Sequence, residues 1–154
     1  MNENYKEIKT QITSLTTGTR FLITDLSNIS SSLYHFVKDI NWVGFYFVKD
    51  DNLHLGPFNG KPACTYIENG KGVCGYTLKE KKTVYVKNVH EFTGHIACDP
   101  NSNSELVIPL FSHNEVVALL DIDSEKLDRF NKNDISNLED IAKYIETLFT
   151  KELL

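Results

Sequence analysis

Helical patterns occupy both ends of this chain, and strand patterns occupy the segment between them. Near the start, apolar residues recur at steps of three or four over residues 5–15 and again over 22–37, with a break at 16–18. The same spacing returns over residues 135–149, after cap candidates at 131–134. Amphipathic helices need another element against which to bury their apolar faces, so the pattern favours a layered fold.

Short runs rich in aromatic and β-branched residues fill the middle of the chain. The expected strands are residues 42–49, 52–58, 83–87, 106–111 and 115–122. The last two are predicted to form a hairpin, and the sheet is expected to be largely antiparallel. A length of 154 residues is close to that of one average domain. We therefore expect one α+β domain that spans residues 1–154, with helices from both ends of the chain around the sheet.

Composition narrows the functional classes. With 41% apolar and 24% charged residues, the chain is typical of soluble globular proteins. A net charge of -5 argues against a nucleic-acid or anionic-membrane surface. The longest apolar run, residues 42–48, is far shorter than the ~20 residues that span a bilayer, and the start lacks the basic and apolar segments of a secretory signal. We expect a cytoplasmic protein that binds neither nucleic acid nor membrane.

All three cysteines lie on two segments rich in turn-forming residues, 56–75 and 88–104. Long loops inside a compact domain are often lids or binding loops. In a reducing compartment, clustered cysteines are usually buried residues, metal ligands or redox-active thiols. The clustering of Cys64, Cys74 and Cys98 is therefore the first indication of chemistry.

Three stretches of the sequence resemble one family, and they read PFNGKPACTYIENGKGVCG, NVHEFTGHIACDPNSNSELVIPLF and LLDIDSEKLDRF. The combination is specific because it places one cysteine in each of GKPAC, GVCG and GHIACD, ahead of SEL and DIDS. Over residues 41–130 the chain is similar to the free methionine-R-sulfoxide reductases, an enzymatic branch of the GAF-domain fold. The resemblance implies a single GAF domain, with a six-stranded antiparallel sheet flanked by N- and C-terminal helices.

The resemblance also implies a reaction, the reduction of free L-methionine-(R)-sulfoxide to L-methionine. Electrons would come from thioredoxin through an intramolecular disulfide, with no bound cofactor and no metal. A homodimer formed through the terminal helices is expected by the same likeness.

A thiol-dependent reductase needs a nucleophilic thiolate, an acid that protonates the departing oxygen, and a second thiol that resolves the sulfenic acid as a disulfide. The resemblance gives Cys98 the role of nucleophile, Cys64 that of main resolving cysteine and Cys74 that of third cysteine. The sequence leaves open whether Cys64 or Cys74 resolves. Both lie on Gly- and Pro-rich chain that is expected to be flexible, which suits a thiol that must move.

Three acidic residues near the predicted hairpin are candidates for the acid. If the hairpin loop has three residues, 112–114, Glu105 lies opposite Asp121 and diagonal to Asp123, so all three share one face of the sheet. A two-residue loop would put Glu105 on the other face. Neighbouring carboxylates raise one another's pKa, so one can stay protonated near neutral pH, and together they can also hold an ammonium group. The resemblance gives Glu105 and Asp123 roles in binding and oxygen protonation, with Asp121 in support.

The opposite face of the second strand is expected to carry an apolar row, Val116, Ala118, Leu120 and Ile122.

An aromatic pair is the candidate for a methyl pocket. Trp42, Gly44 and Tyr46 alternate along one strand and so point the same way. The missing side chain at Gly44 is expected to leave a gap between the two rings that fits the S-methyl group of a substrate, and sulfur contacts aromatic edges favourably. Without the resemblance, such a strand is more often plain core.

Two other functions compete with the reductase hypothesis. Cys64, Cys74 and Cys98, with His90 or His95, would supply the ligands of a Cys3His zinc centre, although the chain lacks a CxxC pair. A non-catalytic GAF module that senses a small molecule is the second alternative, but binding alone does not need three cysteines near one pocket. Zinc that survives chelation would favour the first, and tight ligand binding without turnover the second.

Overall fold

The structure is a computed structural model that describes residues 4–94 and 100–154. Its α-helices are α1 (Tyr5–Thr16), α2 (Leu22–Phe36), α3 (Gly72–Glu80) and α4 (Lys132–Glu146), and two short 3-10 helices are η1 (Val89–Glu91) and η2 (Thr147–Thr150). Its strands are β1 (Trp42–Lys49), β2 (Asn52–Gly60), β3 (Tyr66–Ile67), β4 (Val84–Val86), β5 (Ser104–Ser112) and β6 (Glu115–Ser124). The predicted α+β class with terminal helices around a six-stranded antiparallel sheet is confirmed.

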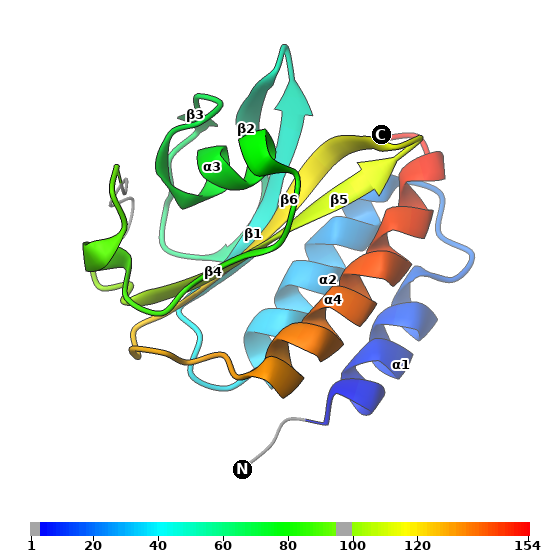
Figure 1. The fold of residues 1–154 in the computed structure, drawn as a ribbon. Coiled ribbons are helices and arrows are strands. Elements are labelled where there is room, and N and C mark those ends of the chain that lie inside the picture. The colour runs from blue at the N-terminus through cyan, green and yellow to red at the C-terminus, as the bar shows by residue number, and fades with distance from the viewer. Residues whose placement is uncertain (1–3, 95–99) are drawn as a thin grey trace.

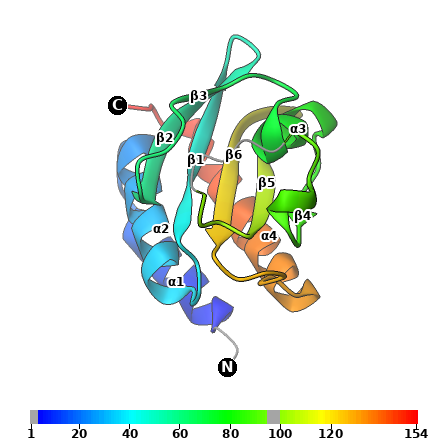
Figure 2. The ribbon, with the colours of Figure 1, turned by 90° about the vertical axis from the view of Figure 1, so that its left-hand side faces the viewer.

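The six strands form one sheet in the order β3-β2-β1-β6-β5-β4, and all neighbouring strands are antiparallel. Helices α1, α2 and α4 lie together on one face of this sheet, whereas α3 lies on the other (Figures 1 and 2). We call these the helix face and the pocket face. None of the helices in residues 4–94 and 100–154 has the length and apolar character that crossing a membrane requires.

Both faces of the sheet are buried, which explains the continuous apolar run in β1. Because side chains alternate across a strand, Val43 and Phe45 enter the core beneath the three helices, whereas Trp42 and Tyr46 pack on the pocket face. The helix-face core includes Ile12 of α1, Leu26, Ile29 and Leu33 of α2, and Leu138, Ile141 and Ile145 of α4, together with Leu106, Leu110, Leu120 and Ile122 from the sheet.

Helix α4 begins at the cap that the sequence predicts. The Asn131 side chain accepts a hydrogen bond from the Asp134 backbone N–H, and the Asp134 side chain accepts one from the Asn131 backbone N–H. This capping box satisfies two backbone donors that a helix start otherwise leaves unpaired. The C-terminal end is anchored by Lys151, whose ammonium lies 2.6 Å from the buried carboxylate of Asp25.

The segment 56–75, predicted as one long loop, is more ordered in structure than expected. It contains the end of β2, the short strand β3 and the first turns of α3. The backbone requires glycine at two positions of this segment. Gly72 has φ +62, and a Cβ on Gly75 would come within 2.6 Å of the Glu68 carbonyl oxygen. These glycines permit close packing and a helix start, so Cys74 lies on helix α3 and the prediction of a loop at this position is wrong.

Candidate active site

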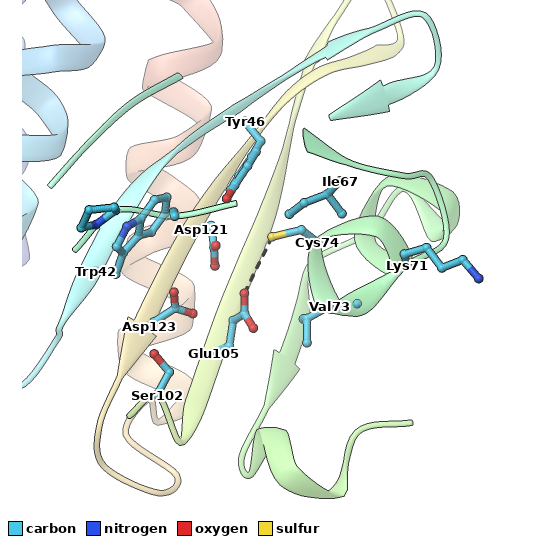
Figure 3. Close-up of a pocket in the computed structure, with 13 residues that line it drawn as sticks. Trp42, Tyr46, Ile67, Lys71, Val73, Cys74, Ser102, Glu105, Asp121 and Asp123 are labelled. Atoms are coloured by element: carbon cyan, nitrogen blue, oxygen red, sulfur yellow. Dashed lines mark hydrogen bonds between the residues drawn. The ribbon is translucent and has the colours of Figure 1, made fainter. Parts of the chain in front are cut away.

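A pocket opens on the pocket face, between helix α3 and strands β1, β5 and β6 (Figure 3). Six of the residues that the sequence singles out line it: Trp42, Tyr46, Cys74, Glu105, Asp121 and Asp123. The other lining residues are Pro62, Ala63, Ile67, Lys71, Gly72, Val73 and Ser102. Cys98, the expected nucleophile, lies outside the described residues.

The three acids share one face of the sheet, but the hairpin that places them there differs from the predicted hairpin. The hairpin turn has two residues, since Ser112 pairs with Glu115, and both His113 and Asn114 have positive φ, as a tight turn matched to the strand twist requires. A shift in register between Leu110 and Phe111 then adds one residue to β6. The prediction of a three-residue loop is therefore wrong.

This β-bulge restores the shared face that a two-residue turn alone would have destroyed. Beyond it Glu105 pairs with Asp123, and Asp121 pairs with Val107. The predicted pairing of Glu105 with Asp121 is therefore wrong, because Glu105 lies opposite the residue two positions further along β6. All three carboxylates nevertheless line the pocket. The bulge also separates Val116, which packs on the pocket face, from the rest of the predicted apolar row, Ala118, Leu120 and Ile122, which packs on the helix face.

Burial dominates the electrostatics of the acids. Glu105 is 8% exposed and Asp121 is 5% exposed. Burial, followed by repulsion from Asp121, raises the pKa of Glu105 well above its ordinary value. Burial and repulsion from Asp123 likewise raise the pKa of Asp121. A carboxyl group that holds its proton near neutral pH can donate it to a departing oxygen.

Cys74 belongs to the same buried group. Its thiol lies on the first turn of α3 and donates a hydrogen bond to Glu105 Oε2 at 3.7 Å. Burial, followed by the neighbouring charges of Asp121 and Glu105, raises the pKa of this thiol well above its usual range. The structure describes Cys74 as a free cysteine. A high pKa disfavours the thiolate, so Cys74 is a poor nucleophile in this state.

The aromatic pair packs more tightly than a methyl slot allows. The rings of Trp42 and Tyr46 stack with centroids 6.0 Å apart, whereas a methyl group between two ring faces needs about 7 Å. A Cβ on Gly44 would lie 2.3 Å from the Phe58 Cβ and 2.7 Å from the Trp42 ring, so the space at this glycine is already filled. The predicted gap between the rings is absent, although both rings still line the pocket.

The same pair anchors the segment that carries Cys64. The Trp42 indole N–H donates to the Lys61 carbonyl oxygen at 3.1 Å, and the Tyr46 hydroxyl donates to the Cys64 carbonyl oxygen at 3.0 Å. Cys64 is disulfide-bonded. A sulfur in a disulfide is no thiolate ligand, so this state is incompatible with the predicted Cys3His zinc centre.

Sequence reasoning missed Ser102 and Asn41. Ser102 is 6% exposed, lines the pocket and accepts a hydrogen bond from the Asn41 side-chain amide at 3.0 Å. The Asn41 backbone N–H also donates to the Asp123 carbonyl oxygen at 2.9 Å. The cluster of turn-forming residues at 100–104 was the available signal, but it marks a turn without indicating which side chain faces inwards.

Comparison with known proteins agrees with this architecture. Residues 24–149 match the GAF domain family, so the fold and the pocket on its sheet define a GAF-domain protein. Over 144 residues the chain is 42% identical to the free methionine-R-sulfoxide reductase of Escherichia coli (strain K12), covering 94% of this chain and 87% of that protein. The chain belongs to the free methionine-R-sulfoxide reductase family, as its motifs predict.

Two solved structures extend the likeness to three dimensions. The fRMsr of Staphylococcus aureus in complex with substrate has a TM-score of 0.91 and 46% sequence identity, covering 96% of this chain and 97% of that chain. The free methionine-R-sulfoxide reductase from Neisseria meningitidis in complex with its substrate also has a TM-score of 0.91, with 39% identity, covering 95% of this chain and 88% of that chain.

Proposed function

We propose that this protein reduces free L-methionine-(R)-sulfoxide to L-methionine with its own thiols. Its relatives in the family carry this activity in their names. One observation supports the proposal independently of the family relationship. Cys64, whose carbonyl oxygen is bound by Tyr46 beside the pocket of buried acids, is disulfide-bonded, whereas Cys74 is a free thiol. A module that only binds a ligand has no use for an oxidised cysteine pair next to buried carboxyl groups.

In the first step Cys98 is the nucleophile. Its thiolate attacks the sulfoxide sulfur, the S–O bond of the substrate breaks, and the oxygen passes to Cys98, which becomes a sulfenic acid. Methionine leaves as the reduced product. The oxygen gains negative charge as the S–O bond weakens, so the reaction needs a proton donor at that point.

The buried acids supply that proton and a site for the substrate's ammonium group. The raised pKa values of Glu105 and Asp121 favour a carboxyl group that is still protonated near neutral pH. Asp121 Oδ1 is buried and has no hydrogen-bond partner among the described residues, which leaves an acceptor for a donor from the substrate. Asp123 faces Glu105 across the two strands and completes the group.

Trp42 and Tyr46 have two roles in this proposal. They form the apolar side of the pocket, where the S-methyl group contacts ring edges. Their hydrogen bonds also hold the 61–64 segment, which brings the resolving cysteine to the pocket.

In the second step Cys64 resolves the sulfenic acid. The Cys64 sulfur attacks the Cys98 sulfur, the thiol proton of Cys64 and the hydroxyl group of the sulfenic acid leave together as water, and a disulfide between Cys64 and Cys98 forms. Thioredoxin then reduces this disulfide by thiol–disulfide exchange. The free state and the burial of Cys74 support Cys64 as the main resolving thiol.

The setting of the reaction is part of the same proposal. A disulfide that must be reduced in every cycle fits the cytoplasm, where thiol reductants are maintained. We further propose that residues 1–154 form one GAF domain and that two copies associate through their terminal helices. Exposed apolar side chains on α1 and α2, Leu15, Tyr34 and Phe36, support this association.

The decisive experiment compares four substrates, the R and S epimers of methionine sulfoxide, each free and within a peptide. With thioredoxin, thioredoxin reductase and NADPH supplied, we expect methionine to form from the free R epimer alone. Formation of methionine from peptides or from the S epimer would contradict the proposal. Calorimetric binding of free methionine sulfoxide without turnover would favour a sensor module.

A further inference from the structure

Three potential metal ligands meet at the inner end of the pocket, and the proposed reaction does not need all of them together. The Cys74 sulfur, a Glu105 carboxylate oxygen and an Asp121 carboxylate oxygen all lie within 4.8 Å of one another. Figure 3 shows the Cys74 sulfur facing Glu105, with Asp121 beside them. All three side chains are buried.

The spacing of these atoms suits a tetrahedral cation. Zn²⁺ binds cysteine sulfur at about 2.3 Å and carboxylate oxygen at about 2.1 Å, so tetrahedral ligand atoms lie roughly 3.4–3.6 Å apart. The Cys74 sulfur is already 3.7 Å from Glu105 Oε2. The other separations are at most 4.8 Å, so small side-chain rotations would bring all three atoms into contact with one ion.

A second observation points to a missing positive partner. Asp121 is 5% exposed, lines the pocket, and its Oδ1 accepts no hydrogen bond from a described residue. Within residues 4–94 and 100–154, neither Asp121 nor Glu105 forms an ion pair with a Lys or Arg. Lys71 lines the pocket, but its ammonium points away from the acids (Figure 3). In their ionised form, buried carboxylates are normally paired or bound to metal, so a cation here would replace the protons that these groups otherwise hold.

We propose that Cys74, Glu105 and Asp121 form a binding site for a thiophilic divalent cation, Zn²⁺ or Cd²⁺, within the pocket. On binding, the Cys74 thiol and each of the two carboxyl groups that still holds a proton release it to solvent, the sulfur and the two carboxylates each donate an electron pair, and a fourth position faces the pocket. This site differs from the Cys3His centre considered from the sequence, because it uses one cysteine and two acids and no histidine.

The expected consequence is competitive inhibition, and this part rests on the proposed function. A cation held by Glu105 and Asp121 occupies the acids that would protonate the sulfoxide oxygen and bind the ammonium group. The inhibited enzyme would still hold its Cys64 disulfide or thiol unchanged. Substrate and cation should therefore exclude each other.

The test uses the oxidised protein, because Cys74 is then the free thiol. Titration with Cd²⁺ should give an ultraviolet sulfur-to-cadmium charge-transfer band that saturates at one equivalent. Cys74→Ser should abolish the band, and Asp121→Asn should weaken Cd²⁺ affinity at least ~10-fold, the lower end of what loss of even an outer-shell partner costs. Glu80→Gln, on the exposed end of the same helix, is the control and should bind Cd²⁺ like the wild type.

The possible results separate this site from the proposed function. An absent band, or an undiminished band in Cys74→Ser, would overturn the cation site. Circular dichroism shows whether each variant is folded. If a variant does not fold, the wild-type titration alone still tests whether the protein binds Cd²⁺ through sulfur. In the reduced protein, Zn²⁺ should raise the KM for methionine sulfoxide and EDTA should reverse this. A normal Cd²⁺ titration with no reductase activity before metal is added would contradict the proposed function alone.

Discussion

The two faces of the sheet differ in chemistry although the same strands build both. On the helix face, Leu120 and Ile122 of β6 enter an apolar core under α1, α2 and α4. On the pocket face, Leu119 is followed by Asp121 and Asp123 at alternate positions of the same strand. The alternation of a β-strand thus lets ten residues contribute to folding on one side and to a reactive site on the other.

The buried groups of the two faces also differ in how they contribute to the free energy of folding. Burying carboxyl groups without charged partners is unfavourable, whereas burying aliphatic side chains is the main favourable contribution to folding. Most of the largest fully buried side chains belong to the helix face. The apolar residues of both faces are expected to stabilise the protein, and the buried acids of the pocket face are expected to reduce its stability.

The largest expected effect tests the chemistry of the pocket face alone. Cys98→Ser should abolish methionine formation, because the nucleophile is lost while the helix-face core is untouched. Single-turnover assays with reduced protein and free methionine-(R)-sulfoxide measure this. Cys64→Ser is the matched variant and should retain the first turnover while losing thioredoxin-dependent cycling. Equal single-turnover yields from Cys98→Ser and the wild type would refute the assignment of the nucleophile.

The acids of the pocket should matter nearly as much. Glu105→Gln or Asp123→Asn should lower kcat/KM by about 10²–10⁴-fold, the usual contribution of a positioned acid. Both replacements keep the size of the side chain and remove only its ability to ionise. Thermal unfolding followed by circular dichroism should show folded proteins. Wild-type rates in both variants would exclude an acid cluster.

Adjacent leucines on opposite faces provide a direct comparison. Leu119 and Leu120 are both 0% exposed, and each replacement by alanine should lower the free energy of unfolding by about 2–5 kcal/mol. Leu120→Ala should keep the wild-type KM per folded molecule. Leu119→Ala should also raise the KM, because Leu119 pairs with Tyr46 across β1 and β6. Urea unfolding and steady-state kinetics measure the two quantities, and an equal KM in both variants would show that the faces are not separable.

The buried acids should give the protein an unusual dependence on pH. Their pKa values are raised by folding, so in the window that begins at about pH 4 and ends at the raised pKa values, the folded state holds protons that the unfolded state has lost. Stability contributed by these groups is therefore present at low pH and falls as pH rises through this window. Urea unfolding of Asp121→Asn across the window should show a weaker fall than the wild type. Glu80→Gln, at the exposed end of α3, should behave like the wild type, and parallel curves for Asp121→Asn and the wild type would contradict the raised pKa.

The smallest effect concerns the anchor of the 61–64 segment. Tyr46→Phe removes the hydrogen bond to the Cys64 carbonyl oxygen, which contributes about 0.5–1.5 kcal/mol. Cycling with thioredoxin should slow by no more than about tenfold. The rate of disulfide formation after a single turnover, followed by loss of free thiols, reports this step. An unchanged rate would mean that the hydrogen bond does not position Cys64.

The fold was predictable from the sequence because its signals are local and repeated. The limits of β1 agree with the prediction, and the cap of α4 lies at the predicted residues. The register of the hairpin could not be predicted from the sequence, because a β-bulge depends on packing rather than on turn residues. The predicted three-residue loop and the observed two-residue turn with a bulge both leave Glu105 and Asp121 on one face.

Helix α3 shows a second limit. Its sequence, GVCGYTLKE, contains two glycines, which normally weaken a helix. Gly75 is needed because α3 packs directly on the Glu68 carbonyl oxygen, a contact between segments that no local pattern reveals. The sequence therefore indicated Cys74 as a site residue but placed it on a loop, whereas it lies on a helix. The filled space at Gly44 has the same origin, since Phe58 comes from the neighbouring strand.

The anchoring of the 61–64 segment by Trp42 and Tyr46 has a consequence for how this enzyme can vary. Both hydrogen bonds end on carbonyl oxygens of the main chain, which every amino acid possesses. Side chains at residues 61–63 can therefore be exchanged, by evolution or by an engineer seeking a different sulfoxide, while the attachment of the segment persists.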